Sequence, residues 1–341
     1  MRRGWRVALG AVAFGLVGIA GFVGAARQGW LKPDEAALRT RYGLPASRHV
    51  TIAGRTLHYV DEGQGPVVIL VHGSFASLRM WDDWAAALRD RYRVIRFDRP
   101  RMGLSAPGAD GRSDGESDAR VIAALADRLK LDRFALVGTS SSGEGVARFA
   151  ATHPRQVSVV ILANTAAGPI APQPPHFPPW FKAVLAVDPW LGGWHSRLFW
   201  RGVLEANFAD PGKVTPALVA EWTDLNNLPQ GAPLVRTPGG PPPFAGTPAD
   251  LAAIRAPALV LWSDRDPEVP LETHGRLTLA RLGSTAKRLE VVRGCGHMLP
   301  LECGPASAAA ARAFLDATLT VDRIDPAARS PARPLPLSSA R

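Results

Sequence analysis

Nearly continuous apolar runs alternate with amphipathic segments along most of this chain. Runs that are apolar at every position, rather than at every second one, are typical of strands buried on both faces, with helices covering those faces. Together with an antiparallel hairpin at residues 50–63, the six runs predict an α/β fold: an eight-stranded, mostly parallel sheet with helices on both faces. The runs lie at residues 67–73, 92–98, 134–138, 157–163, 258–262 and 288–292, and the amphipathic segments lie near 78–90, 117–130, 142–152, 272–282 and 301–319.

The charge and the cysteines exclude two classes of partner. The 341 residues include 40 Lys+Arg and 30 Asp+Glu, for a formal net charge of +10. The arginines are scattered singly and no nucleic-acid-binding motif accompanies them, so we expect no nucleic-acid partner. Cys295 and Cys303 allow either one disulfide or two small buried side chains. Because there is neither a CxxC pair nor a His/Cys cluster, we expect no metal site.

Residues 1–30 have the composition of a membrane anchor. An uncharged stretch at residues 7–26, about 30 Å long as a helix, follows Arg2, Arg3 and Arg6. Basic residues before such a span favour a cytoplasmic N-terminus, so the rest of the chain is expected outside the cytoplasm, in the periplasm or extracellular space. Two alternatives remain open: a cleaved signal peptide, since small residues at 23–26 suit a signal peptidase, and a mere apolar tail.

The segment LVGTSSSG (136–143) follows a buried strand and opens a helix. This is the setting in which a nucleophile elbow holds a serine on a sharp turn, and Ser140 takes the nucleophile position. Gly138 supplies the small neighbour that the turn needs, whereas Ser142 stands where the usual pattern has its second glycine. Ser141 or Ser142 therefore remains an alternative nucleophile. The non-catalytic alternative is that the segment is only a helix N-terminus capped by hydroxyl groups.

The segment VILVHGSFAS (68–77) ends the strand expected beside the elbow strand. Its His-Gly pair turns the chain so that the following backbone amides point inward, where they can stabilise an oxyanion. We expect the hole to consist of the N–H of Ser74, with Phe75 as a further donor, and the N–H of Ser141. For His72 we favour an anchoring role in the loop over proton transfer.

Two further strand ends carry an acid and a base. In APALVLWSDRDPEVP (256–270), a strand leads into an acidic loop, from which we choose Asp266 as the carboxylate that orients a histidine; Asp264 and Glu268 lie two residues to either side. In VVRGCGHMLPLE (291–302), His297 follows the last strand on a glycine-rich loop, a setting that none of the other seven histidines has.

A serine, an acid and a histidine in this chain order, each at a strand end, resemble the α/β-hydrolase fold superfamily. The resemblance covers residues 48–320 and extends to VIRFDRPRMGLS (94–105), which is similar to the family's Asp-x-x-Gly-x-Gly-x-Ser segment. It implies that residues 31–165 and 251–320 form the core. Residues 166–250, which hold 16 of the 31 prolines, are then an inserted helical cap over the site. The Pro-, Ser- and Ala-rich tail at 321–341 is expected to be disordered.

The resemblance implies a serine hydrolase that cleaves a carboxylic ester, or a related acyl bond, through an acyl-enzyme, without a metal or organic cofactor. Serine at position 140 argues against the epoxide-hydrolase and haloalkane-dehalogenase branches. A cofactor-free perhydrolase, a C–C bond hydrolase and a non-catalytic binding protein on the same fold remain alternatives. We expect a small apolar substrate, because aromatic cap residues could line the pocket. These are Trp180, Phe181, Trp190, Trp194, Phe199, Trp200, Phe208 and Trp222.

Overall fold

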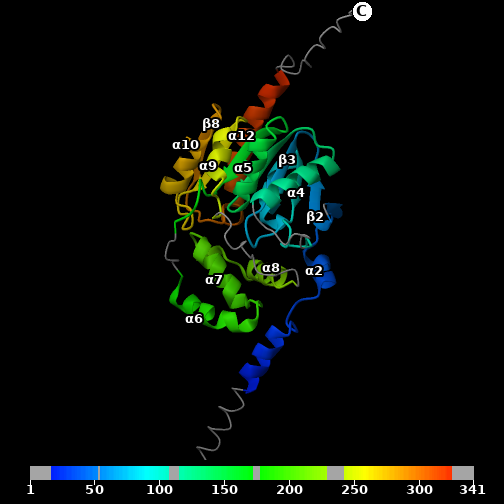
Figure 1. The fold of residues 1–341 in the computed structure, drawn as a ribbon, viewed down its shortest axis with the longest axis vertical. Helices are drawn as coiled ribbons and strands as arrows, with labels where there is room; N and C mark the ends of the chain where they lie inside the picture. Colours follow the sequence, from blue (N-terminus) through cyan, green and yellow to red (C-terminus); the bar gives the residue numbers. More distant parts are fainter. Residues whose placement is uncertain (1–16, 53, 107–114, 172–176, 229–241, 325–341) are drawn as a thin grey trace, which may run out of the picture.

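Eight strands form one sheet in a computed structural model that describes residues 17–52, 54–106, 115–171, 177–228 and 242–324 (Figure 1). Their spatial order is β1-β2-β4-β3-β5-β6-β7-β8; β1, β2 and β4 pair antiparallel, and all other pairs are parallel. The predicted eight-stranded, mostly parallel sheet is confirmed. The strands are β1 (Ser47–Ile52), β2 (Arg55–Glu62), β3 (Val67–Val71), β4 (Arg93–Phe97), β5 (Phe134–Thr139), β6 (Val157–Ala163), β7 (Ala258–Ser263) and β8 (Lys287–Val292).

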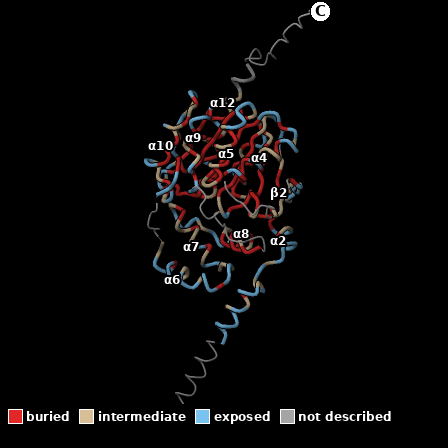
Figure 2. Tube along the Cα trace, in the orientation of Figure 1, coloured by how far each residue is buried: buried red, intermediate tan, exposed pale blue. Residues whose placement is uncertain are grey.

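Helices cover both faces of the sheet, because the central strands are apolar on both sides. On one face lie η1 (Leu78–Trp81), α3 (Asp82–Leu88), α11 (Leu299–Glu302) and α12 (Gly304–Ile324). On the other lie α4 (Gly115–Arg128), α5 (Ser142–Thr152), α9 (Thr247–Ala253), η4 (Leu271–Gly275) and α10 (Arg276–Arg281). Figure 2 shows the buried residues concentrated in these layers. The carboxyl ends of the parallel strands are thereby held rigidly at one edge.

A separate group of helices lies at that edge (Figure 1). It consists of α6 (Pro179–Val187), η2 (Asp188–Leu191), α7 (Arg197–Asn207), η3 (Pro211–Lys213) and α8 (Pro216–Asn226), which we call the cap helices. Thr215, which precedes Pro216 at the first position of the helix, caps α8 and accepts a hydrogen bond from the Leu218 N–H. Trp200, Leu204 and Trp222 form the centre of a small apolar cluster that joins α7 and α8 to the core.

The helix α2 (Glu35–Tyr42) was not predicted, although Asp34 caps it and Glu35 follows in the first turn. It packs on α8, where the Tyr42 hydroxyl donates to Asp224 at 2.6 Å. Residues 17–27 are also helical, and the Phe22 ring lies edge-on to Trp194 of the cap, 5.7 Å between centroids.

The predicted membrane anchor and the predicted C-terminal tail lie only partly within the described residues. In the described part of the chain, no helix combines the length and the apolar character needed to span a membrane. Residues 1–16, which contain the first part of the predicted anchor, lie outside the described residues, as do residues 325–341 of the predicted tail. The last helix, α12, continues to Ile324, beyond its predicted end near residue 319.

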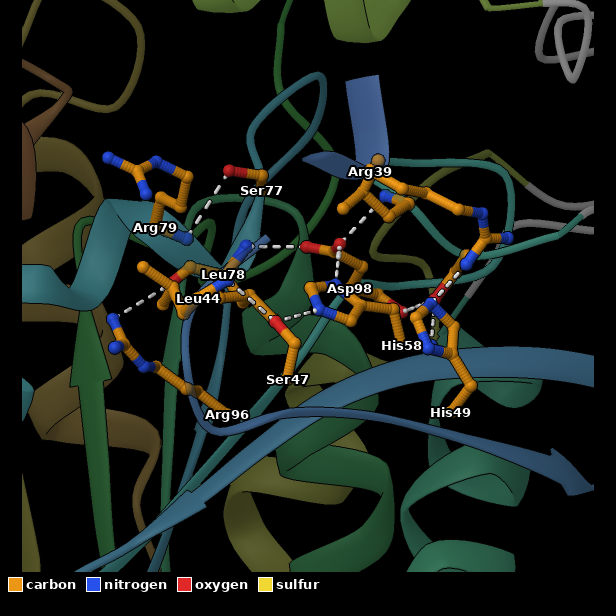
Figure 3. Close-up of polar contacts among 12 residues, drawn as sticks. Arg39, Leu44, Ser47, His49, His58, Ser77, Leu78, Arg79, Arg96 and Asp98 are labelled. Carbon is orange, nitrogen blue, oxygen red and sulfur yellow. Dashed lines mark hydrogen bonds and ion pairs between the residues drawn. The ribbon is translucent and has the colours of Figure 1, made fainter. Parts of the chain in front are cut away.

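A buried carboxylate fixes the hairpin and the turn after β4 (Figure 3). Asp98 accepts hydrogen bonds from the Leu78 and Leu104 N–H groups and contacts His58 Nδ1 at 2.7 Å. Burial opposes ionisation, but the contact with His58 keeps the pKa of Asp98 below its usual value. A Cβ on Gly103 would come within 2.2 Å of Asp98 Cγ, which explains the glycine in the segment that resembles the family's pattern.

Candidate active site

Ser140 lies on the sharp turn between β5 and α5. Its φ is +53°, the left-handed region that non-glycine residues rarely occupy. The turn is crowded: a Cβ on Gly138 would come within 2.7 Å of Val146 Cγ2, and one on Gly73 within 3.0 Å of Ser140 Cβ. This crowding is the physical reason for glycine at both positions, and the strained turn lifts the Ser140 hydroxyl above the sheet edge.

The two neighbouring serines face other partners. Ser142 Oγ is buried, donates to the Val71 carbonyl at 2.7 Å and accepts from the Thr139 N–H at 2.9 Å. Ser141 Oγ accepts hydrogen bonds from Ser74 Oγ and Arg99 Nη1, both at 2.8 Å. The hydroxyl in place of the second glycine therefore joins the elbow to β3, and of the three serines the structure brings Ser140 to the histidine.

The loop after β3 and the turn after β5 carry the predicted oxyanion-hole amides. Ser74, Phe75 and Ser141 all line one pocket with Ser140, and within the described residues no protein acceptor is found for their N–H groups. His72 anchors this loop: Nδ1 contacts the Gly73 carbonyl, and Nε2 accepts the Arg99 N–H at 2.9 Å. Burial lowers the pKa of His72 to about 4, so the ring is neutral and suited to this role.

His297 and Asp266 meet Ser140 from two other loops. His297 Nε2 lies 2.8 Å from Ser140 Oγ, and His297 Nδ1 lies 2.8 and 3.0 Å from the two Asp266 oxygens. Asp264 instead accepts the Gly294 N–H in an exposed turn. The serine, histidine and carboxylate that the sequence singled out thus form one hydrogen-bonded chain.

Asp266 is held by groups that sequence reasoning missed. Its Oδ1 accepts the N–H groups of Glu268 and Val269, and its Oδ2 accepts Asn164 Nδ2 at 2.7 Å. Asn164 is fully buried at the end of β6, has φ of +44°, and also accepts the Ser263 N–H. Its position after the VSVVILA run was the available signal, since a polar residue at a strand end of this edge faces the site.

The electrostatics of His297 are set by two carboxylates. Burial alone would lower the pKa of its imidazole, but Asp266 and Glu268 raise it to about 9. Asp266 faces Nδ1, whereas Glu268 Oε2 lies 3.3 Å from Nε2. Glu268, which the sequence left without a role, is therefore part of the site.

The loop that carries His297 is fastened to the cap. The His297 N–H donates to the Asn207 carbonyl at 2.8 Å. The buried Glu302 carboxylate accepts three N–H groups, those of Gly296, Ala209 and Asp210. Glu302, also missed from the sequence, joins the histidine loop to the chain that follows α7.

Of the two alternatives left open for the cysteines, the structure has the disulfide. Cys295 and Cys303 are bonded, with their Cα atoms 6.2 Å apart. The bond joins the histidine loop to the residue between α11 and α12, so the loop is held at both its cap side and its core side.

The pocket above Ser140 has a volume of about 230 Å³. The aromatic cap residues expected to line it do not: Phe181, Trp200 and Trp222 are buried in the cap itself, while Trp190 is exposed. A small group of helices must bury its own large side chains to be stable, so the buried aromatic residues form the interior of the cap and do not line the pocket. The apolar lining instead consists of Phe75, Ala166, Ile170, Val203, Phe244, Val269 and Met298.

In the described residues no group of three or more His, Cys, Asp or Glu side chains is arranged to hold a metal ion. The polar lining consists of Ser74, Ser140, Ser141, Asn164, Asn207, Glu268 and His297.

The order of the strands and the Ser–His–Asp chain can be compared with known proteins. A family model described as "Alpha/beta hydrolase family" matches residues 68–317. The chain belongs to the alpha/beta hydrolase family. This hydrolase is 27% identical over 256 residues to 2-hydroxy-6-oxononadienedioate/2-hydroxy-6-oxononatrienedioate hydrolase 2 of Pseudomonas putida, covering 71% of this chain and 85% of the relative.

Two solved structures share the fold of this hydrolase. An esterase from Thermogutta terrifontis has a TM-score of 0.65 at 23% identity and covers 80% of this chain and 99% of its own. A bacterial membrane phospholipase A has a TM-score of 0.62 at 23% identity, covering 92% of this chain and 99% of its own.

Proposed function

We propose that this hydrolase cleaves a carboxylic ester of a small apolar acyl group. The observation that carries the proposal is the hydrogen-bonded chain from Ser140 Oγ through His297 to Asp266, next to a pocket with a mostly apolar lining. A serine hydroxyl is a weak nucleophile and needs such a base to attack a carbonyl carbon.

The reaction follows from the positions of these atoms. Ser140 Oγ attacks the ester carbonyl while His297 Nε2 takes the hydroxyl proton, and Asp266 holds the imidazole orientation and stabilises its cationic form. The N–H groups of Ser74, Phe75 and Ser141 stabilise the oxyanion. Nε2 then gives the proton to the leaving alcohol, and water hydrolyses the acyl-enzyme by the same route.

A second candidate is hydrolysis of a C–C bond, because the Pseudomonas putida relative is named for a dienedioate substrate. Such a substrate carries carboxylates. Among the described residues that line the pocket there is no Lys or Arg to bind a carboxylate, which favours the ester.

The test is a series of 4-nitrophenyl esters with straight acyl chains of increasing length. Each buried methylene contributes about 0.8 kcal/mol, so kcat/KM is expected to rise up to about fourfold per methylene from acetyl to butyryl and hexanoyl. It should fall once the chain exceeds the pocket. A higher kcat/KM for a dienoate C–C substrate than for every ester would favour the second candidate, and preference for polyhydroxylated esters would contradict the apolar pocket.

The pH dependence follows from the pKa of His297. The imidazole must be neutral to accept the serine proton, and its pKa is raised to about 9. We therefore expect kcat/KM to rise with pH through an apparent pKa well above 6.5 and near 9. A pH profile measured with an ester that has no ionisable group checks this, and a plateau reached already at pH 7 would contradict it.

We also propose that residues 1–30 attach the enzyme to a membrane, with the catalytic domain outside the cytoplasm; secretion after cleavage is the alternative. Figure 1 draws the helix of residues 17–27 and α6 at the same end of the molecule. The exposed large apolar side chains of these two helices and of the chain next to them suit the interface of a bilayer. They are Val17, Ile19, Phe22, Trp30, Trp180, Val187, Trp190 and Leu198.

Removing residues 1–30 is expected to move the enzyme from the membrane fraction to the soluble fraction. Hydrolytic activity should be retained, because the first residue of the site is Ser74. Fractionation and an ester assay on both forms measure this. A full-length chain found in the soluble fraction at its full mass would contradict attachment, and one that lacks its first residues there would indicate secretion.

A further inference from the structure

Glu268 is the one carboxylate that lines the pocket among the described residues. Its backbone is fixed, since its N–H donates to Asp266 Oδ1 at 2.8 Å. Its side chain, 50% exposed, extends over the site and places Oε2 3.3 Å from His297 Nε2. The carboxylate thus faces the nitrogen that exchanges its proton with Ser140.

In the reactive form of the enzyme, in which His297 is neutral, no cation of the pocket neutralises the charge of Glu268. The lining contains no Lys or Arg among the described residues. The Arg99 guanidinium, which donates to Ser141 Oγ, is buried in a two-point ion pair with Asp118. When His297 is neutral, the two carboxylates that contact it, Asp266 at Nδ1 and Glu268 at Nε2, both contribute negative charge beside the reacting atoms.

The reaction itself determines which part of the substrate meets this charge. His297 Nε2 must give its proton to the departing oxygen or sulfur, so the leaving group lies beside Nε2 in hydrogen-bond reach. Since Glu268 Oε2 lies 3.3 Å from the same nitrogen, the leaving group also lies beside Glu268. The acyl group occupies the apolar remainder of the pocket.

We infer that Glu268 selects substrates by the charge of the leaving group, accepting neutral and cationic alcohols or thiols and rejecting anionic ones. The inference rests on the proposed acyl hydrolysis and adds the class of leaving group to it. Charge selection of this kind arises because a like charge beside Glu268 is repelled and an opposite charge attracted, with partial screening by solvent.

Three butyryl thioesters that differ only in the end of the thiol test the inference. Their thiols are 2-mercaptoethyl-trimethylammonium, its neutral tert-butyl counterpart and 2-mercaptoethanesulfonate. Thiol release is read directly with Ellman's reagent, because both cysteines of the chain are in the disulfide. For the full-length enzyme, we expect kcat/KM to fall about tenfold at each step from cation to neutral to anion.

In Glu268→Gln, the cation-to-anion ratio of kcat/KM should fall by about 100-fold, towards one. Glu268→Asp should keep the order of the three substrates, since it keeps the charge. The matched control is Glu272→Gln, an exposed carboxylate paired with Arg276 outside the pocket, which should leave the ratio unchanged. A ratio that Glu268→Gln leaves within twofold of the original enzyme overturns the inference.

Loss of the proposed function is distinguishable from loss of this inference. If no thioester or ester is cleaved, the proposed function fails, and binding alone then tests Glu268. Calorimetry compares ketone analogues of the cationic and the anionic butyryl thioester, in which a CH₂ group replaces the sulfur, so that the charged end occupies the place of the leaving group. Their affinities should differ about 100-fold and converge in Glu268→Gln. Equal affinities in the original enzyme overturn the inference. Thermal unfolding of each variant shows that the fold is intact.

Discussion

Replacing Ser140 with alanine is expected to lower kcat by about 10⁶-fold while the protein remains folded. The substitution removes the nucleophile, and a methyl group on the elbow disturbs neither Gly73 nor the turn. Ester hydrolysis and circular dichroism measure the two expectations. Ser141→Ala keeps the backbone N–H of residue 141, so we expect it to lower kcat far less than Ser140→Ala does.

A fluorophosphonate probe checks the same assignment independently. It should form an adduct on Ser140, located by mass spectrometry, because only that hydroxyl contacts His297 Nε2 among the three serines. An adduct on Ser141 or Ser142 would identify that serine, and not Ser140, as the nucleophile. Failure of the unmodified enzyme to react at all would support a non-catalytic binding protein.

Asp266→Asn is expected to lower kcat by about 10⁴-fold, as the equivalent change does in other serine hydrolases. An amide in this position can donate to Nδ1, so it stabilises the wrong imidazole tautomer and no longer stabilises the cation. The hydrogen bonds from Glu268 and Val269 persist when the amide oxygen takes the Oδ1 position, whereas the hydrogen bond from Asn164 Nδ2 is lost because the amide nitrogen then faces it. Thermal unfolding of the variant shows whether the fold is intact.

The matched control is Asp264→Asn, two residues away, whose carboxylate accepts the Gly294 N–H in an exposed turn. It should change kcat less than tenfold. If the two substitutions have the opposite effects, Asp264 orients the histidine in solution and the geometry described for Asp266 does not represent the active enzyme.

The sheet and the Ser–His–Asp chain were predictable from sequence because short, local sequence patterns indicate both. A buried strand must be apolar throughout, as in the run at 157–163, and a strained elbow requires small neighbours such as Gly138. Parallel strands then bring their carboxyl ends to one edge without further information. This is why residues as distant as Ser140 and His297 could be paired from their positions at strand ends.

The supporting groups were not predictable, since their partners are set only by the tertiary structure. Asn164 and Glu302 are ordinary polar residues in the sequence, and their roles come from buried N–H groups and carboxylate oxygens brought in from distant segments. The aromatic cap residues were misplaced for a related reason. Composition reveals how much apolar surface a segment holds, but not whether that surface closes on itself or faces a ligand.

The attachment of the histidine loop to the cap uses mainly backbone atoms on the cap side. Asn207 offers its carbonyl, and Ala209 and Asp210 offer their N–H groups to Glu302. Side chains on this stretch can therefore vary without disturbing the base, provided that the path of the chain is kept. Much of the cap is in this sense exchangeable. Helix α6 and the outer face of α7 can be replaced by those of another family member if three features are retained: residues 207–210, the glycine at 296 that lets the two backbones meet, and the buried Trp200 and Leu204.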